Sequence, residues 1–306
     1  MTQESSEDRR MLGRYRLLDQ LATGGMAVVH LAIEHGAHGL ERPLVIKQLQ
    51  SQHDDETSQR MLLQEARLAA RINHPNVVEI HELGTDGQRP FIAMEFVPGA
   101  QLRELCRAAW DDQVSIPIGV AVGIILQACA GAHAAHELRG PDGQAENLVH
   151  RDLSPHNLMV GAGGHVKVLD FGVAKAEFNP DKTQTGVLKG KYAYMSPEQL
   201  EAGAIDRRSD LFTLATVLWE LIVGRQLFGK MSAIRTIHSV LNGEITAVHA
   251  ERSEVPAELS TVIARALQRE PVERYQSVDE FRRALQNAAQ EAGLNTTSDA
   301  IGEFVR

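Results

Sequence analysis

HRDLSPHN, residues 150–157, is the most specific motif in the sequence. Asp152 and Asn157 lie near the two ends of this short polar segment. Asp170-Phe171-Gly172 follows it, directly after the strand-like run Val166–Leu169. Ser196-Pro197-Glu198 comes next along the chain. No single motif is decisive, but their order and spacing together point to one kind of chemistry.

That chemistry is phosphoryl transfer. It needs a carboxylate to orient the hydroxyl nucleophile and accept its proton, oxygen ligands for Mg²⁺, and a cation on the nucleotide phosphates. Asp152 can be the carboxylate, Asn157 and Asp170 the metal ligands, and Lys47 the cation. Lys47 follows an apolar strand-like run, where a lysine needs an anionic partner. Glu65 is a candidate partner, although an ordinary surface pair is the alternative interpretation.

The rest of the chain reads as a β-rich part followed by a helical part. Two strands flank the turn Thr23-Gly24-Gly25-Met26, where glycines let backbone amides approach phosphate oxygens, although a plain hairpin turn has the same pattern. Further strands are predicted at 44–46, 77–83 and 90–96, with a helix over 57–71 that ends near Asn73 because Pro75 disfavours helical geometry before it. Beyond Pro98-Gly99 the pattern predicts helices over 116–137, 209–223, 255–269 and 278–289 and a short one within 295–306.

These motifs resemble the bacterial branch of the eukaryotic-like (Hanks-type) Ser/Thr protein kinases. Further matches are His74–Val78, Met94–Val97, Arg208–Asp210 and Pro271–Tyr275. The resemblance implies an α+β, protein-kinase-like two-lobed fold with a small β-rich N-lobe and a larger helical C-lobe. We expect a disordered tail over 1–13, a kinase domain over 14–288 divided near residue 97, and a C-terminal tail over 289–306.

The resemblance also implies roles for individual residues. Asp152 is the catalytic carboxylate, and Asn157 and Asp170 hold Mg²⁺ or Mn²⁺. Contacts to ATP are implied for Ala22, Gly24, Gly25, Val29, Val45, Lys47, Glu65, Glu95, Val97, Gln101, Met159 and Asp170. Glu198 and Arg274 form a buried ion pair, and Asp210 braces the loop that carries Asp152. The substrates are proteins.

Two positions depart from the family pattern in a complementary way. Ser154 stands where Ser/Thr kinases place a lysine that reaches the transferring phosphate, and Lys191 stands where they place a threonine that packs against that lysine. A swap of the cation from 154 to 191 would explain both changes, and we count Lys191 among the candidate catalytic residues. The alternative is that Lys191 points to solvent. Two of the three glycines of the phosphate loop are also replaced, by Ala22 and Ala27, and Val45 replaces an alanine.

A regulatory site is expected between Gly172 and Glu198. Thr183 and Thr185 lie in a polar stretch there, and Arg151 directly precedes the catalytic aspartate. Phosphorylation of either threonine would supply negative charge for Arg151 to bind. The alternative is a loop that is merely polar and flexible.

Composition narrows the setting. The net charge of −9 and the pI near 5.8 argue against a nucleic-acid partner, because such proteins usually carry a basic face. Cys106 and Cys129 are too few for a disulfide framework or a four-thiolate zinc site, which favours free thiols in a cytoplasmic protein. The apolar stretch 116–135 is interrupted by glycines and polar residues, so a buried helix is a better interpretation than a membrane span.

Two other functions remain open. A pseudokinase, which binds nucleotide without transferring phosphate, is favoured only by Ser154 and the altered glycines. A small-molecule kinase of the same fold is opposed by Arg151 and the segment 172–198, which resemble peptide-docking and activation machinery. The sequence carries no indication of the oligomeric state.

Overall fold

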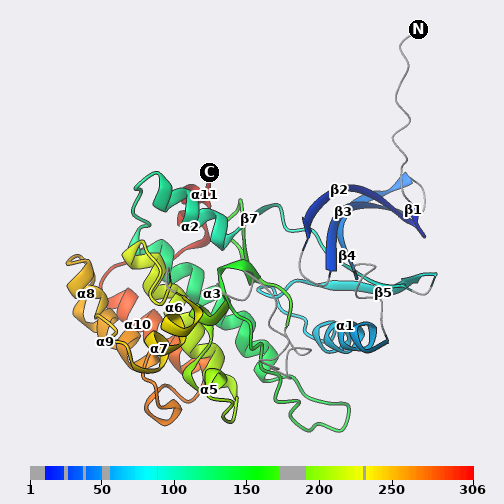
Figure 1. Cartoon of the computed structure of the whole chain (residues 1–306). Coiled ribbons are helices and arrows are strands. Elements are labelled where there is room, and N and C mark those ends of the chain that lie inside the picture. Colours follow the sequence, from blue (N-terminus) through cyan, green and yellow to red (C-terminus); the bar gives the residue numbers. More distant parts are fainter. Residues whose placement is uncertain are drawn as a thin grey trace. The chain divides into compact units, whose positions relative to one another are not determined.

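The computed structural model describes residues 11–23, 27–36, 39–49, 56–87, 89–171, 191–229 and 232–306, without the side chains of 56–59, 61 and 65. The chain forms two compact units. The first consists of the chain up to Arg71 together with Val78–Phe96, and the second of Ile72–Val77 together with Val97–Arg306. A small β-rich unit and a larger helical unit agree with the predicted α+β, protein-kinase-like fold (Figure 1).

The first unit is an antiparallel sheet with one helix. The sheet has the strand order β1-β2-β3-β4-β6-β5. Its strands are β1 (Met11–Leu12), β2 (Tyr15–Thr23), β3 (Ala27–His35), β4 (Glu41–Leu49), β5 (Ile80–Asp86) and β6 (Arg89–Glu95). The helix α1 (Glu56–Ala69) contacts β5 and β6, and it buries Leu62, Ala66 and Ala69 along one stripe.

One face of this sheet forms the core of the unit. Eight buried side chains pack together there: Leu12, Tyr15, Leu17, Ala32, Leu44, Ile46, Phe91 and Ala93. Side chains alternate between the two faces of a strand, so Val45 and Lys47 of β4 lie on the opposite face from Leu44 and Ile46. Val45 and Lys47 are only partly buried. Because Leu44 and Ile46 pack in the core, Val45 and Lys47 must lie on the opposite face of the sheet.

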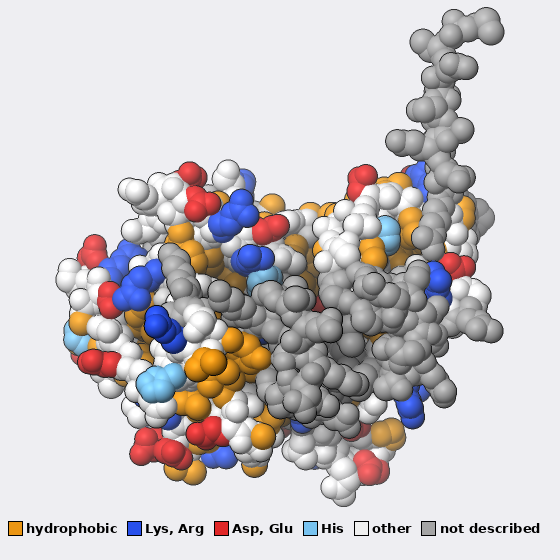
Figure 2. Space-filling view, viewed as in Figure 1, with side chains coloured by type: hydrophobic (Ala, Val, Ile, Leu, Met, Phe, Trp, Pro, Cys, Tyr) orange, Lys and Arg blue, Asp and Glu red, His pale blue; other side chains and the backbone are white. Residues whose placement is uncertain are grey.

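The second unit is mainly helical, with one small sheet. Its helices are α2 (Leu102–Asp111), α3 (Ile118–His136), α5 (Pro197–Leu200), α6 (Arg207–Val223), α7 (Ala233–Asn242), α8 (Val248–Glu251), α9 (Ala257–Ala266), α10 (Val278–Glu291) and α11 (Ser298–Val305). The sheet has the order β7-β8-β9, from β7 (Gly99–Gln101), β8 (Leu158–Gly161) and β9 (Val166–Val168). Acidic and basic side chains are interspersed on the visible face of this unit (Figure 2).

Two largely buried helices, α3 and α6, form the centre of the helical unit. They contact each other, and α10 packs against α3. Both bury residues all the way round, as expected for helices without a polar face. Among the described residues α3 alone is long and apolar enough to span a membrane by composition, and most of it is buried inside the unit. The cysteines of this unit, Cys106 and Cys129, are free and buried.

Three chain segments differ from expectation. Residues 11–13, expected in a disordered tail, begin the sheet, because β1 pairs with β2 and Leu12 enters the core. The helix α1 ends at Ala69 rather than near Asn73, because Ile72–Val77 leave the helix and belong to the helical unit. The segment 289–306, expected to be a tail, extends α10 to Glu291 and adds α11, which contacts α3 and buries Ile301.

Candidate active site

Hydrogen bonds within the 150–157 loop join Asp152 to Asn157. Nδ2 of Asn157 donates to the Asp152 carbonyl oxygen at 2.7 Å and to Oδ2 of the Asp152 side chain at 3.2 Å. The Asn157 N–H also donates to the Ser154 carbonyl oxygen at 3.0 Å, which closes the turn. The Asp152 carboxylate, with 18% of the side chain exposed, is therefore fixed in position while still open to a substrate.

Asp170 reaches the same region through the small sheet. Strand β8 begins directly after Asn157, and its partner β9 ends two residues before Asp170. The N–H of Leu169 donates to the Asn157 carbonyl oxygen at 2.9 Å, which extends this pairing. Asp170 has a φ of 41°, a left-handed value that is uncommon outside glycine. The pairing brings Asp152, Asn157 and Asp170 to one end of the sheet.

The donor set at this end suits a hard divalent cation. The amide nitrogen of Asn157 is committed to Asp152, so its amide oxygen is the atom left to face a metal. Mg²⁺ prefers oxygen ligands and usually takes only one or two carboxylates, with water and substrate phosphates completing its shell. The described residues contain no cluster of three or more His, Cys, Asp or Glu side chains that could hold a metal. Asn157 and Asp170 therefore fit a metal that arrives with a phosphate.

Asp210, at the start of α6, braces the 150–157 loop as predicted. Its carboxylate accepts hydrogen bonds from the backbone N–H groups of His150 at 2.8 Å and Arg151 at 2.9 Å, and it lies 2.7 Å from Nε2 of His136. Burial opposes the charge of Asp210, but the contact with His136 and the bond from His150 hold its pKa below the ordinary value. An ionised, buried carboxylate thus fixes the backbone next to Asp152.

Arg151 is held in a strained conformation by these contacts. Its φ is 64°, and such a conformation persists only where the surroundings impose it. The Asp210 carboxylate binds its N–H, and Nε2 of Gln199 donates to its carbonyl oxygen at 2.8 Å. Sequence reasoning missed Gln199, although the spacing of Ser196 and Gln199 is the signature of the helix capping box that the structure shows there.

His150 connects the loop to the segment around Asp170. Its Nε2 lies 2.7 Å from the Leu169 carbonyl oxygen, and its ring packs against Phe171 with the ring centres 4.8 Å apart. Both rings are almost fully buried. The position of Asp170 is therefore coupled to the 150–157 loop through side-chain packing as well as through the sheet.

Glu198 and Arg274 form the buried ion pair that was predicted. Nη2 of Arg274 lies 2.8 Å from Oε2 of Glu198, and a second bond of 2.9 Å joins Nη1 to Oε1. Arg274 is fully buried and also donates to three backbone carbonyl oxygens. Burial would raise the pKa of Glu198, but the bonds from Arg274 and Ser209 hold it below the ordinary value. The pair anchors α5 to the segment before α10.

Lys191 reaches the predicted catalytic carboxylate. Its Nζ lies 3.5 Å from Oδ2 of Asp152, the same oxygen that accepts from Asn157. The Lys191 side chain is 38% exposed. Ser154 is buried on the same loop, in an extended conformation. In this structure Lys191 is therefore directed at Asp152 rather than only at solvent.

In the β-rich unit, the predicted nucleotide contacts share one face of the sheet. Val29 is paired with Lys47 across β3 and β4, and Ala22 is paired with Val29 across β2 and β3. Val45 is two residues from Lys47 on the same strand and therefore on the same face. Glu65 lies on α1, three residues after Leu62 and four before Ala69.

Two other predicted contacts are neighbours in the helical unit. Gln101, at the end of β7, is paired with Met159 of β8, so their side chains lie side by side. Glu95 belongs to the β-rich unit, where its N–H donates to the Glu79 carbonyl oxygen at 2.8 Å. Any bond from the Glu95 backbone to a nucleotide base must therefore use its carbonyl oxygen. Val97 opens the main segment of the helical unit and is partly buried.

Four predicted positions lie outside the described residues. These are Gly24 and Gly25 of the glycine turn and the two candidate phosphorylation sites, Thr183 and Thr185. The backbone of Glu65 is described but its side chain is not.

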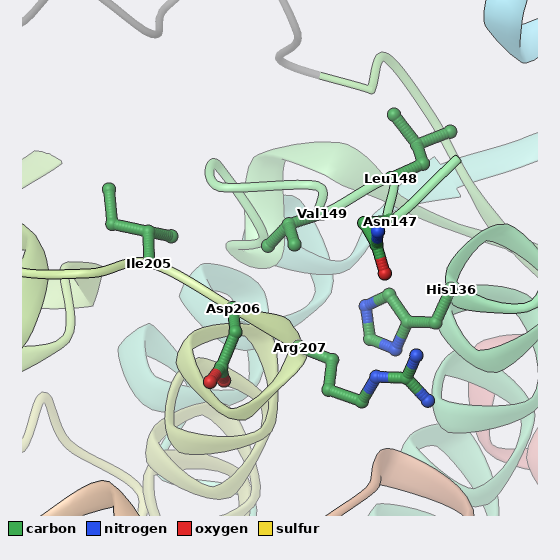
Figure 3. A pocket seen from close by; sticks show the side chains of 7 residues that line it. All are labelled: His136, Asn147, Leu148, Val149, Ile205, Asp206 and Arg207. Carbon is green, nitrogen blue, oxygen red and sulfur yellow. The ribbon is translucent and has the colours of Figure 1, made fainter. Parts of the chain in front are cut away.

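A cavity of about 260 Å³ lies next to the bracing network of Asp210. It is lined by His136, Asn147–Val149 and Ile205–Arg207 (Figure 3). The Asn147 amide oxygen is turned toward the His136 ring, and the Arg207 guanidinium lies beside that ring. None of the predicted nucleotide or metal residues lines this cavity. It is connected to the candidate active site through the bond between His136 and Asp210.

Comparison with known proteins agrees with this geometry. The protein kinase domain family matches residues 15–287. MasK of Myxococcus xanthus, named a tyrosine-protein kinase, is 38% identical over 295 residues, which cover 96% of this chain and 46% of MasK. Two proteins named serine/threonine-protein kinases are each 31% identical over 96% of this chain: PknL of Mycobacterium tuberculosis, of which 70% is covered, and PrkC of Bacillus subtilis, of which 43% is covered. The chain thus spans less than half the length of MasK and PrkC.

Proposed function

The chain belongs to the protein kinase family, and we propose that it is an ATP-dependent kinase that transfers the γ-phosphate to serine or threonine hydroxyls of proteins. The observation that carries the proposal is the convergence of Asp152, Asn157 and Asp170 at one end of the small sheet, held there by hydrogen bonds. A carboxylate beside a metal-binding amide and a second carboxylate is what phosphoryl transfer requires.

In the proposed reaction Asp152 orients the substrate hydroxyl and accepts its proton as the oxygen attacks phosphorus. The bonds from Asn157 keep the Asp152 carboxylate aimed, so less ordering remains to be done when the substrate binds. Lys47 contacts the α- and β-phosphates. The kinase domain extends over residues 14–288.

The remaining nucleotide contacts are assigned to the residues that were predicted from the sequence. Val29, Val45 and Met159 pack on the adenine, with Ala22, Gly24 and Gly25 over the phosphates. Glu65 pairs with Lys47. The adenine edge bonds to the backbone of Glu95 and Val97, and Gln101 reaches the ribose.

Asn157 and Asp170 would hold Mg²⁺ or Mn²⁺. Such an ion, when bound, neutralises charge on the β- and γ-phosphates. The protein's own contribution is to place one amide oxygen and one carboxylate at a fixed separation through the pairing of β8 and β9. The left-handed backbone of Asp170 and the packing of Phe171 on His150 support that placement.

Specificity for serine and threonine is favoured by the sequence of the 150–157 loop. Ser154-Pro155-His156 lacks the alanine-containing pattern of tyrosine kinases. The names of PknL and PrkC support the same assignment, whereas the name of MasK supports tyrosine as the second candidate. Acid hydrolysis of a phosphorylated protein substrate and separation of the phosphoamino acids tests this. Phosphotyrosine as the main product would reverse the assignment.

Activity itself is tested against the pseudokinase alternative. Labelled ATP and Mg²⁺ are incubated with the protein, with and without a generic protein substrate. We expect label to enter protein with the wild type and not with Asp170→Ala, which should keep the wild-type melting temperature. Binding of ATP without any transfer would identify a pseudokinase, and label on a small molecule alone would identify a small-molecule kinase.

Regulation is proposed at Thr183 and Thr185. The kinase phosphorylates one or both, and the phosphate pairs with the Arg151 guanidinium. The fixed, strained backbone of Arg151 supports this role, because it holds the side chain at the base of the loop. Mass spectrometry should find phosphate on these threonines in active protein, and the double alanine variant should lose activity. Unmodified threonines in active protein would contradict the proposal.

The setting follows from the chemistry. ATP and protein substrates are both available in the cytoplasm, and we place the catalytic domain there. For the whole protein we likewise propose this kinase activity, with ATP and protein substrates as its partners.

A further inference from the structure

Lys191 contacts the carboxylate of Asp152, the proposed catalytic residue. Its Nζ is 3.5 Å from Oδ2 of Asp152, and Nδ2 of Asn157 is 3.2 Å from the same oxygen. Oδ2 is thus approached by a neutral donor from within the loop and by a cation from a distant segment of the chain. A residue so placed can act on whatever reacts beside Asp152.

The ion pair adds little to stability. Both side chains are partly exposed, at 38% for Lys191 and 18% for Asp152, and solvent screens the attraction in pairs of this kind. A pair that is weak in the free protein can rearrange at low cost. The Lys191 backbone is nevertheless well anchored, because the next residues, Tyr192 and Ala193, are buried. A fixed backbone with a four-carbon stem gives the ammonium a short, defined reach.

Phosphoryl transfer at Asp152 creates an electrostatic problem that a cation there solves. The carboxylate and the transferring phosphoryl group are both negative, and they approach the same hydroxyl. A fixed positive charge in a partly dehydrated site stabilises such a transition state far more than the same charge does in water. Ser154 cannot contribute this charge.

Other basic groups near the loop are poorly suited. His156 lies exposed in the short helical turn that follows Ser154. Lys167 donates to the Val77 carbonyl oxygen at 3.4 Å. Arg103 lies exposed on α2.

We infer that Lys191 is a catalytic residue that supplies the positive charge on the transferring phosphoryl group, in place of a lysine at position 154. This inference rests on the proposed kinase activity. The hydroxyl oxygen forms a bond to the γ-phosphorus, the bond from phosphorus to the ADP oxygen breaks, and the hydroxyl proton passes to Asp152. Lys191 keeps its proton throughout and contributes charge alone.

The deciding variant is Lys191→Thr, because threonine is the residue that related kinases carry at this position. If Lys191 had no part in the reaction, replacing it with threonine should leave the rate unchanged. We expect instead that Lys191→Thr and Lys191→Met each lower kcat by about 100-fold, which is about 2.7 kcal/mol of transition-state stabilisation. The KM for ATP should stay within about twofold of the wild-type value. The melting temperature should stay within about 2 °C of the wild-type value.

The rescue variant is Ser154→Lys combined with Lys191→Thr. It restores the arrangement of the related kinases and should recover at least tenfold of the lost rate, whereas Ser154→Lys alone should not exceed the wild type. The matched control is Arg103→Ala, which removes another positive charge whose field reaches His156 and should change kcat less than twofold. Rates are measured in single turnovers as well, since product release can limit kcat and conceal a slower chemical step.

The outcomes separate this inference from the proposed function. Wild-type protein that transfers no phosphate would refute the function. Active wild type with a near-normal Lys191→Thr rate would refute the role of Lys191 alone. So would an equal loss in Arg103→Ala, or a loss in Lys191→Thr that Ser154→Lys fails to rescue. If Lys191→Thr melts early, Lys191→Met and Lys191→Arg decide the question, with activity expected only in the arginine variant.

Discussion

Replacing Asp210 by asparagine should release the backbone next to the catalytic carboxylate without unfolding the protein. Oδ2 of Asp210 faces both His136 and the N–H of His150, whereas Oδ1 accepts only from the N–H of Arg151. An asparagine has one oxygen. If the asparagine oxygen takes the Oδ2 position, the contacts with His136 and the His150 N–H remain. The NH₂ group then faces the Arg151 N–H, and no hydrogen bond can form because both groups are donors.

The expected cost is that of one charge-assisted hydrogen bond, about 1.5–3 kcal/mol. Because Arg151 holds a φ of 64°, which costs energy unless its neighbours impose it, the loss should appear as local relaxation of that residue. The Arg151 amide should then exchange its hydrogen about 10- to 100-fold faster, since each 1.4 kcal/mol corresponds to a factor of ten. Asp152 follows in the chain, so kcat should fall while the KM for ATP is preserved.

Hydrogen exchange of the peptide that contains residues 147–153 measures the effect. Asp279→Asn is the control, because it removes another carboxylate whose pKa is held low, at the start of α10 beside Arg282 and Arg283. It should leave the exchange of this peptide unchanged. A fall in melting temperature for Asp210→Asn with no faster exchange at Arg151 would refute the reasoning, because the carboxylate would then stabilise the core and not the loop.

Two further predictions concern pH and nucleotide. Burial raises the pKa of Glu220 to about 8, although bonds from the Leu227 N–H and the Tyr194 hydroxyl offset part of the shift. A raised folded-state pKa gives stability that is complete below the unfolded value and is lost as pH rises through the folded value, so the free energy of unfolding should fall between about pH 4.5 and 8, by up to 1.4 kcal/mol per pH unit. Glu220→Gln should flatten this slope in urea titrations, and an unchanged slope would contradict it. ATP should raise the melting temperature only with Mg²⁺ or Mn²⁺, because the triphosphate must be neutralised beside Asp170; a shift that survives excess EDTA would count against the metal site.

The sequence predicted the long helices α3 and α6 for physical reasons. A helix such as α3, which has no continuous polar face, is expected at the centre of a helical unit, and the structure places it there. The end of α1 could not be predicted, because the preference of Pro75 sets only a limit on a helix. The point where the chain leaves that helix depends on Ile72 and Val77, which are buried in the other unit.

The contacts that hold the site were less accessible to sequence reasoning. Glu198 and Arg274 are far apart in the chain, and the family resemblance alone suggested their pairing. The spacing of Ser196 and Gln199 indicates the helix cap, but it does not indicate that Gln199 also donates to the Arg151 carbonyl oxygen. The relation between Ser154 and Lys191 was visible as two complementary departures, but only the folded structure shows that Lys191 Nζ lies 3.5 Å from the Asp152 carboxylate.

The helix α6 holds both the loop that carries Asp152 and the segment that follows Lys191, so it determines the distance between these two residues. At its start Asp210 binds the backbone that leads into Asp152, and one turn later Oγ1 of Thr213 donates to the Tyr194 carbonyl oxygen at 2.8 Å. Near its end Glu220 accepts from the Tyr194 hydroxyl at 2.9 Å, so the segment that follows Lys191 is fixed at two points. A regular, buried helix has little freedom to change the separation of these anchors. Substitution of Asp210 should therefore displace Asp152, and substitution of Glu220 should displace Lys191. Either change should weaken the ion pair between the Asp152 carboxylate and the Lys191 ammonium.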